Sequence, residues 1–128
     1  MNPVDRTKPN SLAFTLVEIM VVVAIIGVVM LIAVPAFIKP RKQSQGQRIV
    51  NDARQLDAAI NQWAVEKGKQ DGDKVNTTQA ASYLKDGWIA KDILGNSYKI
   101  GTVGTNQVQI AAKTKKALAK CGVDWGPY

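Results

Sequence analysis

The sequence predicts an α+β protein in which one long amino-terminal helix is followed by a small head with a short antiparallel sheet. An apolar run without charged side chains extends from Ile19 to Val34; counted from Phe14, it is long enough to cross a bilayer as a helix. Apolar residues then recur every three or four positions from Ile49 to Trp63, as on one face of a helix. Further along, short apolar stretches flank a glycine-containing turn, which is typical of a hairpin.

Glu18 is the one carboxylate inside the apolar segment, in the stretch Phe-Thr-Leu-Val-Glu-Ile-Met that begins at Phe14. An ionised side chain within hydrocarbon costs roughly 2.5–3.5 kcal/mol on insertion scales. A partner for this charge is therefore expected. The alternative is an ordinary membrane anchor in which Glu18 lies near the end of the span and reaches the lipid headgroups.

These residues resemble the processing and assembly signature of type IV pilins and of the pseudopilins of type II secretion systems. In that family a short basic leader precedes a cleavage point, then Phe-Thr-Leu-[Ile/Val]-Glu and a long apolar helix. The matching scissile bond here is Ala13–Phe14, and Glu18 falls four residues after Phe14. Ala13 departs from the family, which usually has glycine before the cut. The resemblance implies a pilin-like lollipop fold, cleavage by a prepilin peptidase and N-methylation of Phe14.

The resemblance also implies the division of the chain and its partners. Residues 1–13 would be the leader, 14–38 a hydrophobic transmembrane and assembly helix, and 39–128 an amphipathic continuation of that helix plus a small α+β head. The subunit would wait as a single-pass protein of the inner membrane, with its head outside the cytoplasm. An assembly platform in that membrane would then add it to a homo-oligomeric helical filament, either a periplasmic pseudopilus or a cell-surface pilus. In that filament Glu18 would pair with the amino group of Phe14 on a neighbouring subunit.

The flanks of the apolar segment indicate whether it is retained and how it is oriented. A secretory signal would place a small-residue cleavage site after the apolar run, but prolines and basic residues follow it here, so the apolar helix is expected to remain in the mature chain. The bases Lys39, Arg41, Lys42 and Arg48 lie beyond the run, and by the positive-inside rule they would put the head in the cytoplasm. The leader motif implies a peptidase acting on the cytoplasmic face, so the opposite orientation is expected.

The long helix is expected to end near Lys67 and Gly68, where a basic last turn precedes a glycine. Pro35 and Pro40 are expected to kink it, because each removes a backbone hydrogen bond and clashes with the preceding turn. Gly46 is expected to add flexibility nearby.

The head is expected to begin with a polar turn and a short helix, capped near Asn76 and running to about Leu84. The segment from Asp92 to Tyr98 resembles the loop that leads into the sheet of major pseudopilins. It should deliver a strand through Val103. Gly104 to Asn106 would then form the hairpin connection to a strand from Val108 to Ala111.

Composition limits the remaining functions. The chain carries a formal charge of +7, which raises the alternative of a minor pilin that binds DNA or a surface through a basic head. Its bases are scattered among acids, so no specific nucleic-acid partner is expected. Cys121 is the only cysteine. An intramolecular disulfide is therefore excluded, which favours a pseudopilin or a disulfide-free pilin.

No catalytic constellation is visible, because the chain has no histidine and lacks a phosphate-binding glycine loop and zinc spacing. An enzyme is not expected. No cofactor is expected either. Calcium is the open alternative, because some members of the pseudopilin family that this chain resembles bind calcium in their carboxyl-terminal region. Asp92 and Asp124 are its candidate ligands.

Overall fold

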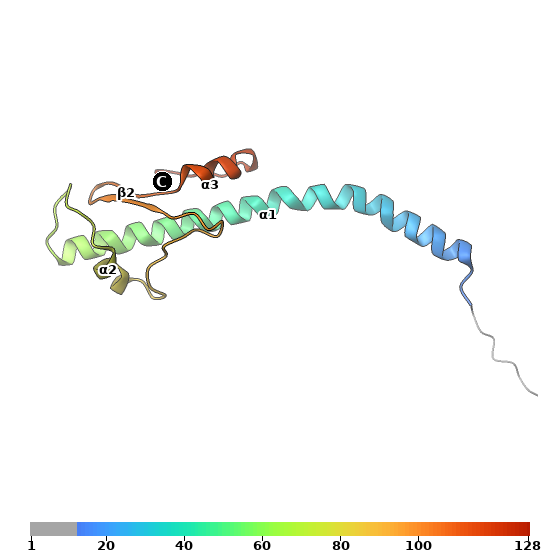
Figure 1. The fold of residues 1–128 in the computed structure, drawn as a ribbon, viewed down its shortest axis with the longest axis horizontal. Helices are drawn as coiled ribbons and strands as arrows, with labels where there is room; N and C mark the ends of the chain where they lie inside the picture. Colours follow the sequence, from blue (N-terminus) through green and yellow to red (C-terminus); the bar gives the residue numbers. More distant parts are fainter. Residues whose placement is uncertain (1–12) are drawn as a thin grey trace, which may run out of the picture. The chain divides into compact units, whose positions relative to one another are not determined.

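The computed structural model describes residues 13–128. The chain divides into two compact units, Met1–Ala36 and Phe37–Tyr128. Residues 1–12, which hold all of the expected leader except Ala13, lie outside the described residues. The elements in chain order are α1 (Leu16–Glu66), α2 (Thr77–Ala80), η1 (Ala81–Tyr83), β1 (Lys99–Thr102), β2 (Thr105–Gln109), α3 (Ala112–Ala117) and η2 (Ala119–Cys121) (Figure 1). The predicted class, a long amino-terminal helix with a small head containing an antiparallel sheet, is confirmed.

Helix α1 spans 51 residues and ends close to the predicted position. Gly68 has a φ of 61°, a left-handed conformation that glycine adopts without strain. The N–H of Lys69 donates to the carbonyl of Ala64 at 2.8 Å, and the N–H of Gly68 donates to Val65 at 3.3 Å. This pair of bonds satisfies carbonyls that the last turn would otherwise leave unpaired.

Pro35 and Pro40 both lie within α1, and neither ends it. Each proline still lacks the N–H that an interior helical residue donates. The kink that the sequence predicts at these residues stays a prediction.

The apolar stripe predicted on the second half of the helix forms the core of the head. Ile49, Leu56, Ile60 and Trp63 are at most 1% exposed. They pack in one cluster with residues from the hairpin and the carboxyl-terminal segment, including Tyr98, Val103, Val108, Ile110 and Leu118. Figure 1 shows β2 and α3 lying along this part of α1. Burial of this face therefore holds the head together.

Strands β1 and β2 form an antiparallel pair in which Lys99 faces Gln109 and Ile100 faces Val108. The hairpin was predicted with its connection at Gly104 to Asn106, but β2 already begins at Thr105. The tighter turn is built on Gly104 at a φ of 82° and is followed by Asn106 at 48°. These left-handed residues let the chain reverse earlier than the alternation of apolar residues indicated.

The polar turn before α2 is docked on this hairpin. Gly72 donates its N–H to the carbonyl of Val103 at 2.8 Å, and Val103 donates to Asp73 at 2.9 Å. Asn76 then caps α2 by accepting from the N–H of Gln79 at 3.1 Å. The predicted short helix thus begins where expected, but its second turn is the tighter η1.

Gly46 has a packing role that the sequence did not indicate. It is buried in α1, and a β-carbon placed on it would lie 2.4 Å from Cγ2 of Val123, too close for any real contact. The absence of a side chain therefore lets the carboxyl-terminal segment approach the helix backbone. Packing, rather than flexibility, explains this glycine.

We predict that Gly46→Ala destabilises the head by overpacking, which typically costs about 1–3 kcal/mol. Because alanine has a higher helix propensity than glycine, it offsets up to about 1 kcal/mol of this loss in the free energy of unfolding. Thermal unfolding in detergent should show a melting temperature lower by about 4–8 °C per kcal/mol of net loss.

The double variant Gly46→Ala/Val123→Ala should recover most of that loss, because the smaller side chain makes room. Gly27→Ala is the matched control, since no atom lies within 4 Å of its added carbon. An equal loss in both glycine variants would contradict the proposed contact.

Candidate functional site: the amino-terminal turn of α1

The first turn of α1 is closed by a reciprocal pair of hydrogen bonds between Thr15 and Glu18. The N–H of Thr15 donates to Glu18 Oε2 at 2.8 Å, and the N–H of Glu18 donates to Thr15 Oγ1 at 3.2 Å. This is a capping box, which satisfies two backbone donors that the start of a helix leaves free. This capping box was not among the features predicted from the sequence, although Thr-x-x-Glu before an apolar run is its signal.

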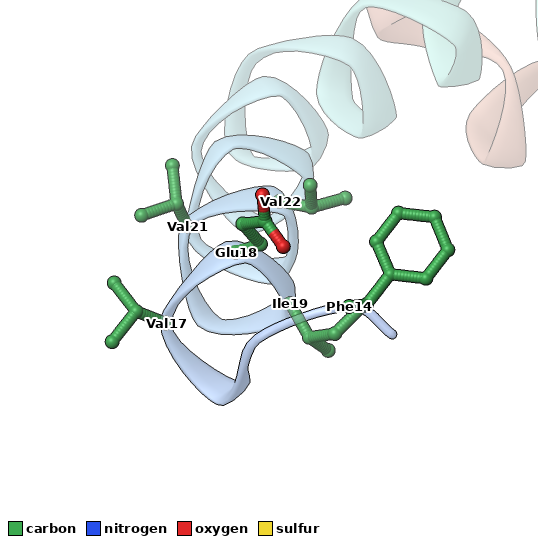
Figure 2. Close-up of a pocket in the computed structure, with 6 residues that line it drawn as sticks. All are labelled: Phe14, Val17, Glu18, Ile19, Val21 and Val22. Carbon is green, nitrogen blue, oxygen red and sulfur yellow. The ribbon is translucent and has the colours of Figure 1, made fainter. Parts of the chain in front are cut away.

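The surroundings of the carboxylate are apolar. Phe14, Val17, Ile19, Val21 and Val22 line an open hollow of about 430 Å³ together with Glu18. Figure 2 shows that Glu18 is the one side chain among these six that carries polar atoms. All six residues are exposed, so the carboxylate lies on an open apolar surface that another apolar helix can cover.

The expected cleavage bond lies just outside the helix. Ala13, Phe14 and Thr15 have no regular secondary structure and are exposed, and the Phe14 side chain is 81% exposed. Proteases cut backbone of this kind in preference to helix. The Ala13–Phe14 bond is therefore accessible in the described structure.

The rest of this segment has the properties of a membrane span. Within residues 13–128, α1 is the helix that is long and apolar enough to cross a membrane, and its most apolar window has no buried residue. Large apolar side chains are exposed on every side from Leu16 to Ile38. Such a surface is stable only against lipid or other apolar helices.

Asp92, a calcium candidate, serves the fold in this structure. It is 6% exposed, and its Oδ1 accepts the N–H groups of Leu94 and Asn96 at 2.9 Å each. Its Oδ2 accepts the hydroxyl of Thr114 in α3, which in turn accepts from Asn96 Nδ2 at 2.9 Å. A cation at Asp92 would have to replace these hydrogen bonds.

Asp124, the second candidate, is exposed and accepts the N–H of Gly126 at 3.0 Å. Among residues 13–128, no group of three or more histidine, cysteine or carboxylate side chains is placed to hold a metal ion. The structure thus does not bring Asp92 and Asp124 together into such a group.

The shifted titrations in the head belong to groups packed against α1. Burial raises the pKa of Asp57 above its usual value, and a hydrogen bond from Tyr128 opposes that shift. Burial, with the nearby charges of Asp52 and Asp92, raises the pKa of Tyr98. The Tyr98 hydroxyl donates to the carbonyl of Ile49 at 3.4 Å. These groups join the carboxyl-terminal half of the head to the helix.

Comparison with known proteins identifies the class. Residues 8–34 match the family described as the prokaryotic N-terminal methylation motif. The chain is 32% identical to the type IV major fimbrial protein FimA of Dichelobacter nodosus over 72% of its own length and 52% of FimA. It is 38% identical to the type IV major pilin protein PilA of Myxococcus xanthus, over 52% of the chain and 30% of PilA. It thus spans about half of the first relative and under a third of the second.

A longer match is with the type II secretion system core protein G of Escherichia coli, at 30% identity over 77% of each chain. The chain belongs to the family of type IV pilins and type II secretion pseudopilins, whose members are structural subunits of filaments. No solved structure matches the chain significantly. The relatives give no support to the alternative of a minor pilin with a DNA-binding or surface-binding head.

We predict that Thr15→Ala frays the first turn of α1, because it removes the oxygen that accepts from the Glu18 N–H. Loss of a threonine cap costs about 0.5–2 kcal/mol. In detergent micelles, amide exchange at Glu18 should accelerate roughly two- to thirtyfold, as that free energy implies. Thr15→Ser keeps the hydroxyl and is the control; equal protection in the alanine and serine variants would contradict the capping role.

Proposed function

We propose that this chain is a pseudopilus subunit of a type II secretion system that is cleaved between Ala13 and Phe14 and assembled through Glu18. The observation that carries the proposal is a carboxylate held at a helix amino terminus within an apolar lining. The choice of pseudopilus over pilus rests on coverage, since the chain spans 77% of core protein G and smaller shares of FimA and PilA. The single cysteine agrees with a head that has no disulfide.

Cleavage would create the partner that Glu18 needs. The carboxylate already accepts from the N–H of Thr15, one residue from the nitrogen of Phe14 that cleavage turns into a charged amine. In the membrane, the capping box supplies the carboxylate with a hydrogen bond. In a filament, an amine of a neighbouring copy would enter the apolar hollow and pair with Glu18. At about 4 Å and an effective dielectric near 20, two such charges attract by roughly 4 kcal/mol.

That attraction offsets the cost of burying the carboxylate and selects one axial position for an incoming helix. A copy shifted along the axis would leave the charge unpaired in apolar surroundings, which is strongly destabilising. The surrounding apolar side chains contribute packing but no such selection. Glu18 therefore specifies register, and the apolar helix provides affinity.

We predict that the mature protein begins at Phe14 and carries an N-methyl group. Intact-mass and amino-terminal analysis of protein extracted from membranes measures both features. Ala13→Gly should be cleaved at the same bond at least as completely, because glycine is the residue that the family usually has there. A mature chain that retains Met1, or one cut beyond Val34, would remove the basis of the processing proposal.

We predict that Glu18→Gln blocks assembly while leaving membrane insertion and cleavage intact. Glutamine can still complete a capping box with Thr15, so this change removes the charge and keeps the hydrogen bond. Loss of roughly 4 kcal/mol of pairing corresponds to about a thousandfold weaker incorporation. Blots of sheared filaments and of the membrane pool, from cells with the variant as sole copy, measure assembly and insertion separately.

Glu66→Gln is the matched control, because it removes an exposed carboxylate from the same helix, where Glu66 accepts a hydrogen bond from Tyr83. It should assemble normally. Normal filaments built from Glu18→Gln subunits would overturn the assembly role and leave Glu18 as a capping residue of a membrane helix.

A further inference from the structure

A group of basic side chains lies where α1 leaves the apolar segment. Lys39, Arg41 and Lys42 follow Ile38 directly, and all three are exposed. No acidic residue occurs in the chain between Glu18 and Asp52, so none is near them along the helix. Three positive charges therefore lie within four residues of the expected membrane surface.

The carboxyl-terminal segment carries a further base, Lys120, three residues before its contact with α1. The contact of Val123 with Gly46 brings the chain that follows η2 to a level on α1 eight residues beyond Ile38, or about 12 Å at 1.5 Å per residue. Lys120 is exposed in η2, three residues before Val123. Figure 1 shows the turn after α3, in red, beside α1. Lys39, Arg41, Lys42 and Lys120 are called the basic collar below.

The chemistry of the collar fits phosphate. Arginine binds phosphate oxygens through two parallel N–H groups, and lysine supplies a compact positive charge. Lys39, Arg41 and Lys42 directly follow a run long enough to cross a bilayer, where phospholipid headgroups are expected. Side chains of this length also extend toward the headgroups while their methylene groups remain on apolar surface.

A second copy of the chain is a less suitable partner. Its own acids at the far end of α1, Glu66, Asp71 and Asp73, alternate with Lys67, Lys69 and Lys74. That region presents no surface of one negative sign to complement the collar. Charge complementarity therefore favours a lipid surface over head-to-collar pairing.

We propose that the basic collar binds the phosphate groups of anionic phospholipids in the leaflet from which α1 emerges. The contacts hold the head against the membrane before assembly and must break when the subunit leaves the bilayer. The proposal also gives a function to basic residues that the positive-inside rule would assign to the cytoplasm. It requires insertion of α1 in a membrane but not the pairing of Glu18.

The test uses the full-length protein in uncharged detergent micelles, titrated with phosphatidylglycerol or phosphatidylcholine, with bound lipid counted by native mass spectrometry. Phosphatidylglycerol should bind at least tenfold more tightly than phosphatidylcholine. Each basic residue near a lipid surface contributes about fivefold to affinity. The triple variant Lys39→Gln/Arg41→Gln/Lys42→Gln should therefore bind phosphatidylglycerol about a hundredfold more weakly, and Lys120→Gln alone about fivefold.

The matched control removes the same number of charges elsewhere on the head, through Lys74→Gln/Lys85→Gln/Lys99→Gln. All three lysines are exposed, and this variant should bind phosphatidylglycerol within threefold of the unaltered protein. Lys39→Arg/Lys42→Arg, which keeps both charges, should also retain binding.

Three results would overturn the proposal. Equal losses in the two glutamine triples would show attraction by net charge alone, and equal affinity for both lipids would show that no anionic headgroup is recognised. Displacement of phosphatidylglycerol by millimolar inorganic phosphate would identify a free-phosphate site instead. Because these readouts involve no filament, they are separate from the assembly test on Glu18.

Discussion

One continuous helix has to be stable in two different surroundings, and the rest of the structure depends on that requirement. From Leu16 to Ile38, α1 exposes apolar side chains on every side, which only lipid or neighbouring helices can cover. From Ile49 to Trp63, only one face is apolar, and the head buries it. Both parts belong to the one helix α1 (Leu16–Glu66). The hydrophobic effect thus separates the two roles along a single element.

Two carboxylates with apolar neighbours, Glu18 and Asp92, are each hydrogen-bonded to a threonine. Glu18 and Thr15 satisfy each other's backbone donors at the start of α1. Asp92 and Thr114 join the loop before β1 to α3. Glu18 accepts one backbone N–H, and Asp92 accepts two backbone N–H groups and the Thr114 hydroxyl; such bonds lower the cost of placing a carboxylate in apolar surroundings. They differ in exposure, because Glu18 is open to a partner whereas Asp92 is buried within one chain.

The two proposed contacts of α1, with a neighbouring subunit and with lipid, involve charges of opposite sign. The proposed pairing needs a single negative charge at the amino end, and the proposed lipid contact needs the positive collar that begins at Lys39. In the sequence, a charge-free run lies between Glu18 and Lys39, and a helix of that length is about what a bilayer core requires. The two proposed contacts thus lie at opposite ends of the apolar run, and the side chains between them offer only non-directional packing.

The sequence by itself determined the family, the long helix with its ends, the buried stripe and the existence of a hairpin. Each follows from periodicity, an apolar run or a local motif, which are properties of neighbouring residues. Only the tertiary structure showed that Gly46 is small because Val123 packs on it, and that Thr114 engages Asp92 across 22 positions. It also showed that β2 begins at Thr105, earlier than predicted, and that Ala112–Ala117 form the helix α3. These features depend on contacts between distant segments, whose free energy no local pattern of residues records.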